Sequence, residues 1–412
     1  MKSTFSPIKK IVFLLLIGFL FFILAWVVIS EAKDSVYGGE FFIQWSSGRL
    51  VAFENKNPYT IPHSLQNIFP NQASTRQYPE LLNTPLYSLV LIFPFMLIEN
   101  FQLAFYIWLI FNIFCAYVLM VSIFQFVEME QSWLIVIPVI LYLGFSFNSF
   151  QAFISGSLIV STSVFLILSL LALKTGKNEL AGIFLAFTTI QPQYFLLIYI
   201  LAVIWGISSR KWGYIIWFLA GIFILTVVGV FVIPGWILDY IRVLLNNNVN
   251  SLTWTPGEVL LSWLPGIGKQ LGWAFTFSMI VILLFEWFAV RKKEIRWYYW
   301  TVCLTIAASQ LIGLAGNLSG QFILTIPILL ILSIWVERAH HGQRIMILAV
   351  IFFLAIEWLI SQRAGFNQAL KPAASLYFLL PLVTLAGIFW VRWWAIRPGR
   401  LYIEELRKNE NG

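Results

Sequence analysis

The most constraining feature of this sequence is the recurrence of apolar runs close to the length of a membrane-spanning helix. A helix needs about 20 apolar residues to cross the hydrocarbon core of a bilayer. Runs of this kind, some of them short or broken, occur at residues 11–30, 86–98, 103–124, 132–147, 157–173, 179–206, 213–233, 270–290, 297–315, 318–336, 344–360 and 375–396. The pattern predicts an all-α integral membrane protein with about 12 transmembrane helices.

The composition agrees with a membrane protein and indicates no nucleic-acid partner. Of the 412 residues, 60% are hydrophobic and 11% are charged, whereas soluble domains carry about 25% charged residues. The net charge of +8 comes from short basic clusters between apolar runs, which is the pattern of cytoplasmic loops. We therefore expect residues 1–412 to form a single polytopic domain surrounded by lipid, with no separate soluble domain.

The basic clusters also predict an orientation. The run at 11–30 follows three lysines and lacks a good cleavage site, which predicts an uncleaved anchor with its N-terminus in the cytoplasm. Counting spans from there puts Arg210-Lys211, Arg291–Arg296, Arg338–Arg344 and the basic C-terminal tail in the cytoplasm. Lys174 and Lys177 are the exception, because the same count puts them outside. The predicted location is a bacterial plasma membrane, with both termini cytoplasmic.

The first predicted outer segment, residues 31–85, is far longer than a connection requires. Its aromatic and apolar residues within 40–53 are compatible with a helix lying in the membrane interface. Glu40 and Gln44 share one helical face with the small Ser47 and Gly48. A carboxylate held at the membrane surface can act as a general base on a lipid-borne substrate. The alternative interpretation is an amphipathic helix whose Glu40 faces water.

Two later segments interrupt the apolar pattern. Residues 147–157 (FNSFQAFISGS) place a polar, glycine-containing stretch between two predicted spans, and Ile190–Gln193 contains Pro192. Proline removes a backbone donor and disrupts a helix. Such a break is tolerated at membrane depth where it lines a cavity or packs against neighbouring helices. The sequence leaves both interpretations open.

The segment EFFIQWSSGRL (40–50), followed by Asn57-Pro58-Tyr59, resembles the first-loop signature of class C membrane glycosyltransferases (GT-C). The most similar pattern is that of the polyprenol-phosphate-mannose-dependent mannosyltransferases. Further resemblances lie in QYPELLNTPLYSLVLIFPF (77–95), GSLIV (156–160), LAGIFLAFTTIQPQ (180–193) and NLSGQFILTIP (317–327). The chain departs from the family pattern by Glu40 in place of Asp, by Ser157 in place of Gln, by Gln191 in place of Lys, and by Gln321 near the place of a His. These departures leave the identity of the sugar open.

The resemblance implies an inverting hexosyltransferase that acts at the outer face of the membrane. Its donor would be a polyprenyl-phosphate-sugar, with mannose favoured, and its acceptor a cell-envelope lipid or glycan. Glu40 would be the general base, and Asp34 is a rival acid close to the first span. The candidates for binding substrate, including cations that could hold the donor phosphate, are Gln44, Arg49, Tyr59, Arg242, Gln321, Arg363 and Lys371.

No cofactor or metal is expected. Cys115 and Cys303 lie inside apolar runs, and the outer segments hold no Asp-x-Asp pair of the kind that ligates a hard cation. Three other functions stay open. A flippase or transporter for lipid-linked glycans would carry charges in mid-span and repeat its fold. A ligase or polymerase of lipid-linked sugars would place its largest outer loop late in the chain. The last alternative is a catalytically inactive relative.

Overall fold

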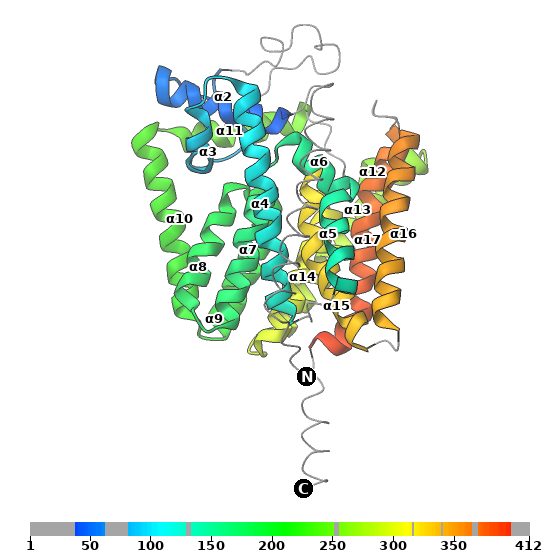
Figure 1. The fold of residues 1–412 in the computed structure, drawn as a ribbon. Coiled ribbons are helices and arrows are strands. Elements are labelled where there is room, and N and C mark those ends of the chain that lie inside the picture. The colour runs from blue at the N-terminus through cyan, green and yellow to red at the C-terminus, as the bar shows by residue number, and fades with distance from the viewer. Residues whose placement is uncertain are drawn as a thin grey trace, which may run out of the picture.

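A computed structural model describes residues 38–61, 81–128, 133–250, 255–314, 317–338, 341–364 and 370–396, and in these ranges it is helical without strands. Most helices stand side by side in a bundle, and α2 lies across one end of it (Figure 1). The helices of the first half are α2 (Gly39–Glu54), η2 (Leu86–Ser88), α3 (Leu89–Met96), α4 (Phe101–Val127), α5 (Trp133–Phe145), α6 (Phe147–Ser155), α7 (Ile159–Lys174), α8 (Asn178–Phe187), η3 (Thr188–Ile190) and α9 (Pro192–Ser208). Those of the second half are α10 (Trp212–Val232), α11 (Trp236–Asn250), α12 (Pro256–Trp263), α13 (Gly268–Ala289), α14 (Ile295–Ile312), η4 (Ser319–Leu324), α15 (Thr325–Arg338), α16 (Gly342–Ala364) and α17 (Leu370–Ala395).

Six of these described segments are long and apolar enough to cross a membrane. They are Phe101–Val127, Trp212–Val232, Gly268–Ala289, Ser319–Glu337, Gly342–Gln362 and Tyr377–Ala395. A seventh span results if α5 and α6, which meet at a bend of 51°, are taken together. The all-helical membrane architecture predicted from sequence is therefore confirmed. The count of about 12 spans is not confirmed, and the predicted first span, residues 11–30, lies outside the described part of the chain.

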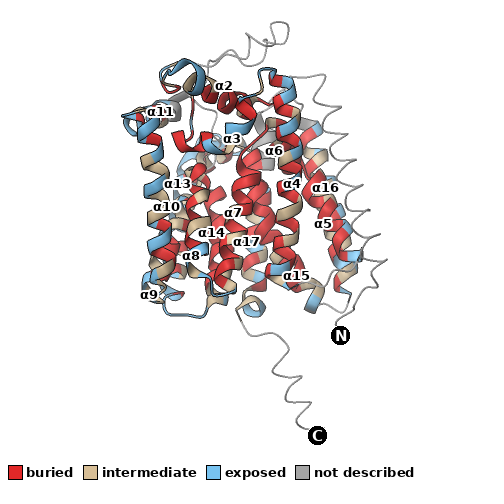
Figure 2. Cartoon of the chain, turned by 60° about the vertical axis from the view of Figure 1, so that its left-hand side comes forward, coloured by how far each residue is buried: buried red, intermediate tan, exposed pale blue. Residues whose placement is uncertain are grey.

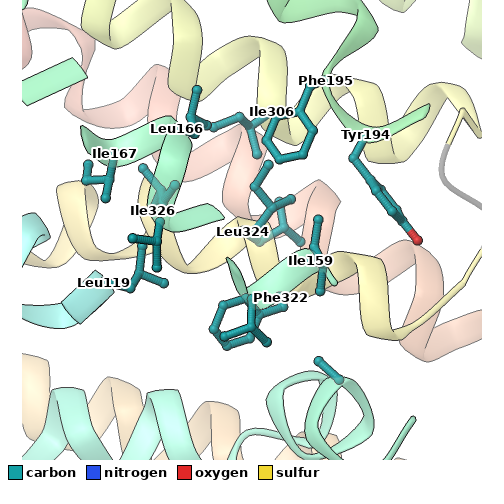
Figure 3. Packing of buried hydrophobic residues seen from close by; sticks show 14 of the residues in the cluster. Leu119, Ile159, Leu166, Ile167, Tyr194, Phe195, Ile306, Phe322, Leu324 and Ile326 are labelled. Carbon is teal, nitrogen blue, oxygen red and sulfur yellow. The ribbon is translucent and has the colours of Figure 1, made fainter. Parts of the chain in front are cut away.

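The centre of the bundle is mainly apolar, with a smaller number of buried polar side chains. Figure 2 shows that α7 and α14 are buried along most of their length, and Figure 3 shows how side chains from both pack with α4, α9 and η4. By contrast, only 22% of the residues in the apolar 18-residue stretch of α10 are buried, and the share is the same for α13. An apolar helix with so much exposed surface requires lipid around it. The burial pattern thus agrees with a protein whose solvent is the bilayer.

The predicted span at 86–98 is wrong. η2 and α3 together cover eleven residues, about 17 Å of helix, which is too short for a core of about 30 Å. Both ends of this segment also return to α2: Ser88 Oγ donates to Gln44 Oε1 over 3.2 Å, and Trp45 Nε1 donates to the Ile98 carbonyl over 3.1 Å. The segment lies against α2 at one end of the bundle.

The single predicted span at 179–206 is also wrong, although the predicted break at Ile190–Gln193 is confirmed. The chain doubles back between α8 and α9, because Thr188 Oγ1 donates to the Tyr199 hydroxyl over 3.1 Å. Residues eleven positions apart in a continuous helix would lie about 16 Å apart. Pro192 begins α9 and cannot extend the preceding helix, since it has no backbone N–H. The segment is a helical hairpin inside the bundle.

The lack of a span at 86–98 and the hairpin at 179–206 together change the side on which Lys174 is expected. Lys174 at the end of α7 pairs with Glu128 at the end of α4 over 2.6 Å and donates to the Phe126 carbonyl over 2.8 Å. Phe126 in turn packs on Tyr299, near the start of α14 and the basic segment Arg291–Arg296, with ring centroids 4.8 Å apart. Lys174 therefore lies with the other basic loops, at the end of the bundle opposite α2 (Figure 1). The prediction that Lys174 lies at the same end as α2 is wrong. The span count included residues 86–98, which do not span, and treated the hairpin of α8 and α9 as a single span.

Candidate active site

The start of α2 is fixed on the junction of α6 and α7. Gly38 has φ of +77° and donates its N–H to the Ile154 carbonyl over 2.8 Å. Phe41 is fully buried and stacks on Trp108 with ring centroids 5.4 Å apart. Gly156, at φ +68°, lets this happen, because a Cβ there would lie 2.6 Å from the Cβ of Phe41. Left-handed backbone and close approach both require glycine, so Gly38 and Gly156 together set where α2 begins.

Glu40 lies in the first turn of α2 and contacts a segment from the other end of the chain. Its Oε1 accepts a hydrogen bond from Ser319 Oγ over 2.7 Å and one from Asn317 Nδ2 over 3.1 Å. The positive end of the helix dipole favours a carboxylate at this position. Within the described ranges, both of these hydrogen bonds fall on Oε1, so Oε2 is left to accept a further proton donor.

Asn317 is itself held in one orientation. Its Oδ1 accepts hydrogen bonds from the Tyr194 hydroxyl over 2.6 Å and from the Gly320 backbone N–H over 3.1 Å. The amide nitrogen must then face Glu40, since an amide offers one acceptor oxygen and one donor nitrogen. Tyr194 begins the returning arm of the α8–α9 hairpin, and Figure 3 shows its hydroxyl directed away from the apolar core.

A carboxylate with one oxygen fixed by two donors and the other open is suited to general-base chemistry. The donors orient the group without neutralising it, which is the preorganisation that catalysis needs. In the described ranges, no group of three or more His, Cys, Asp or Glu residues could hold a metal ion. Independently of that finding, a carboxylate held in this way can take the proton of a hydroxyl group.

A comparison with protein families identifies the class of this chain. The model of glycosyltransferase family 87 matches residues 83–293, just over half of the 412 residues. The chain belongs to glycosyltransferase family 87. This is a membrane family of the GT-C type, so the protein is a membrane glycosyltransferase. Comparisons with curated proteins and with solved structures gave no match.

Glu40 and its two hydrogen-bond donors lie outside the region that the family model matches. The matched region runs from the segment before η2 to the loop after α13, and Glu40 precedes it whereas Asn317 and Ser319 follow it. In this family 87 protein the candidate base and its two hydrogen-bond donors therefore lie outside the residues on which the family assignment rests, although Tyr194, which orients Asn317, lies inside them.

Two of the predicted substrate-binding residues, Gln44 and Arg49, hold α2 against the segment of η2 and α3. Gln44 is buried and donates Nε2 to Thr84 Oγ1 over 2.8 Å. Arg49 donates to the Met96 carbonyl over 3.1 Å and lies over the ring of Trp45. Gln44 and Gly48 therefore pack on the segment of η2 and α3, whereas Glu40, on the same face, is directed to Asn317 and Ser319.

Tyr59 belongs to the same scaffold. Its hydroxyl donates to the Thr84 carbonyl over 2.8 Å, and the side chain is 3% exposed. Burial raises the pKa of Tyr59, so the phenol stays protonated and remains a donor. The turn before it is fixed by Asn57, whose Oδ1 accepts the Tyr59 N–H and whose Nδ2 donates to Asp239 Oδ2 over 2.7 Å.

Arg242 and Gln321 form their described contacts with residues other than Glu40 and its donors. Arg242 on α11 pairs with Asp239 over 3.0 Å, and its side chain is 73% exposed. Gln321 is buried and points into the bundle, where it accepts from Asn148 Nδ2 over 3.1 Å and donates to the Tyr377 carbonyl over 2.6 Å. Asp34 lies outside the described residues. The backbone positions of Arg363 and Lys371 lie on α16 and α17, and their side chains are outside the described part of the structure.

Sequence reasoning missed Asn317, Ser319 and Tyr194. A signal for Asn317 and Ser319 is present in the sequence. The segment NLSG (317–320) is a polar interruption between two apolar runs, and it begins one of the stretches that resemble the GT-C family. The resemblance pointed to Gln321 instead. In a 3₁₀-helix, successive residues are rotated by about 120°, so Ser319 and Gln321 face different directions. Tyr194 carries no signal of its own, since its role depends on the hairpin that brings it beside Asn317.

Proposed function

We propose that this family 87 protein transfers a hexose, with mannose favoured, from a polyprenyl-phosphate-sugar donor to a cell-envelope lipid or glycan acceptor. Membership of the family supports sugar transfer in general. The single observation that carries the mechanism is the carboxylate of Glu40, fixed by Ser319 and Asn317 at one end of the bundle. The donor class is supported by the apolar helices that surround this end, since a lipid-borne substrate reaches such a site from within the bilayer.

The proposed reaction takes place at the outer face of the membrane. The basic loops gather at the end opposite α2, and basic loops favour the cytoplasm. Glu40 would then take the proton of the acceptor hydroxyl while the oxygen of that hydroxyl attacks the anomeric carbon. The bond from that carbon to the phosphate oxygen breaks, and polyprenyl phosphate leaves as an anion. One displacement of this kind inverts the configuration at the anomeric carbon.

The test uses purified protein in liposomes that contain polyprenyl-phosphate-mannose, -glucose or -arabinose, with a cell-envelope lipid extract as acceptor. Consumption of each donor is followed for the wild type, Glu40→Gln and Glu54→Gln. Glu54 is a matched control, because it ends the same helix and pairs with Lys56 in an exposed position. We expect one donor to be consumed, and Glu40→Gln to lower turnover by about 10²–10⁴-fold, the usual contribution of a general base.

Each other outcome changes the proposal in a defined way. Wild-type turnover in Glu40→Gln would sink the assignment of the base, and loss of turnover in Asp34→Asn alone would transfer it to Asp34. If no donor is consumed, sugar transfer from polyprenyl phosphates is excluded for these three sugars. Translocation of lipid-linked glycans would then be the function to assay.

A further inference from the structure

Glu357 is a buried carboxylate within the apolar helix α16 that the proposed chemistry does not use. The residue is 4% exposed, and its Oε2 accepts the backbone N–H of Phe147 over 2.9 Å. In the described part of the chain, its Oε1 has no hydrogen-bond partner. An ionisable side chain in such surroundings is costly to keep. Its hydrogen bond from the Phe147 N–H therefore indicates what the side chain does.

Phe147 is the first residue of α6, so Glu357 holds the N-terminus of that helix. Ser146 precedes it as the cap, and its hydroxyl oxygen accepts the Ser149 N–H over 3.3 Å. The first N–H groups of a helix have no partner within the helix. A carboxylate beside them supplies an acceptor and also complements the positive end of the helix dipole.

The other end of α6 holds the start of α2. The helix has nine residues, about 13 Å in length. Ile154, in its last turn, accepts the N–H of Gly38, which precedes Glu40 by two positions. Gly156, directly after the helix, accepts Trp108 Nε1 over 2.9 Å and packs against Phe41. A shift of α6 along its axis would therefore move the turn that carries Glu40.

The side of α6 contacts the segment that carries the partner of Glu40. Asn148 donates to Gln321 over 3.1 Å, and the rings of Phe153 and Phe322 lie 6.1 Å apart. Gln321 and Phe322 belong to η4, the same short helix that begins with Ser319. One helix thus contacts both sides of the hydrogen bond between Ser319 and Glu40.

We propose that Glu357 is a positioning residue: by accepting the Phe147 N–H it fixes α6, and through α6 it fixes Glu40 against Ser319. The inference rests on the proposed function for the role of Glu40, but the contacts that it invokes are independent of the sugar transferred. It requires an acceptor at position 357, and it does not require a charge there.

Two substitutions separate these requirements. Glu357→Met keeps the volume and removes the acceptor, whereas Glu357→Gln keeps an oxygen that can accept the Phe147 N–H. Phe147→Pro removes the same hydrogen bond from the donor side, at a helix position where proline is tolerated. This third variant keeps the test decisive if Glu357→Met fails to fold. The matched control is Glu286→Gln, which breaks a part-buried pair with Arg392 (2.8 Å) elsewhere in the bundle.

The first measurement is amide hydrogen exchange over residues 38–42 in each purified protein. We expect Glu357→Met to speed this exchange by about tenfold, because the start of α2 opens more often. Glu357→Gln and Glu286→Gln should resemble the wild type. The second measurement is donor turnover, where Glu357→Met should lower kcat by about 10- to 100-fold, as misplacement of a catalytic group does, with little change in KM.

Wild-type exchange at residues 38–42 in Glu357→Met, or equal damage by Glu357→Gln, would overturn the inference. Turnover in Glu40→Gln distinguishes this failure from failure of the proposed function. If Glu40→Gln is inactive and Glu357→Met is normal in both measurements, only the positioning role is lost. If Glu40→Gln is fully active, the proposed base is lost, and the exchange measurement still decides whether Glu357 fixes α2 through α6.

Discussion

Ser319 donates its hydroxyl to the carboxylate of Glu40 over 2.7 Å, although 279 positions of sequence separate the two residues. The contact joins α2 to η4 and so links segments that lie on either side of the family-matched region. It also gives Glu40 a fixed direction, which an isolated carboxylate at the end of a helix would lack.

Removal of the donors to Glu40 should lower turnover without unfolding the protein. Each hydrogen bond to a charged group contributes about 1.5–3 kcal/mol, so we expect Ser319→Ala and Asn317→Ala each to lower kcat by roughly 10- to 100-fold. The measurement is donor consumption per folded protein. Ser278→Ala is the control, because its hydroxyl donates to the Ala274 carbonyl within exposed α13, and this hydrogen bond involves neither Glu40 nor its donors. Unchanged kcat in both variants would mean that the orientation of Glu40 does not depend on these donors.

Gly156 should tolerate no side chain, unlike a second glycine with the same backbone conformation. An alanine at Gly156 meets Phe41 at 2.6 Å, whereas one at Gly176 (φ +77°) meets nothing within 4 Å. Left-handed backbone alone costs about 1 kcal/mol, and crowding in a packed core adds about 1–3 kcal/mol. Thermal unfolding in detergent should therefore show a much larger loss for Gly156→Ala than for Gly176→Ala. Equal losses would contradict the close packing of Phe41 on this junction.

Cysteine labelling should place Ala52 and Lys177 on opposite sides of the membrane. Ala52 lies near the end of α2 and Lys177 lies among the basic loops, and both positions are exposed. Because Cys115 and Cys303 are buried, the background reaction should be small. A membrane-impermeant thiol reagent added to intact cells should label Ala52→Cys, and should label Lys177→Cys only after permeabilisation. Labelling of both in intact cells would restore the outer location that span counting gave to Lys177.

The pair of Lys174 and Glu128 should make a small contribution to stability that disappears in acid. The hydrogen bond from Lys174 holds the pKa of Glu128 below its ordinary value of 4.5. A carboxylate with a lowered folded pKa stabilises the protein above its unfolded pKa, and this stabilisation is lost as the pH falls through the folded value. Since Glu128 is 75% exposed, we expect Glu128→Gln to lower the unfolding free energy by less than about 1 kcal/mol near neutral pH.

Thermal unfolding of the wild type and Glu128→Gln at about pH 7 and about pH 3.5 checks this linkage. The two melting temperatures should converge at the lower pH. A difference that persists in acid would show that the substitution disturbs the loop by some means other than the lost charge.

The sequence predicted the features that depend on local composition. Apolar runs predicted the helices, the proline at 192 predicted the break, and the aromatic segment after Gly38 predicted a helix that carries Glu40. Each of these follows from propensity or from the need to bury apolar surface, which a short stretch of sequence expresses by itself.

The features that it did not predict depend on contacts between distant segments. The 86–98 run is as apolar as a span, and only its hydrogen bonds to α2 show that both ends stay on one side. The direction of the chain after Pro192 is likewise decided by packing, since a kinked span and a hairpin have the same composition. The partners of Glu40 required the fold of nearly the whole chain before Asn317 and Ser319 could be recognised.

The hairpin of α8 and α9 determines what kind of surface surrounds Glu40. Because the chain turns back after Thr188, the start of α9 lies beside the starts of α2 and η4, where Tyr194, Asn317 and Ser319 surround Glu40. Substitutions at such termini change the polar groups around Glu40 and leave the packing of the bundle in place. On the proposed role of Glu40, a few residues at helix termini can therefore change the polar groups beside the reacting hydroxyl, and the lipid-facing architecture can remain the same.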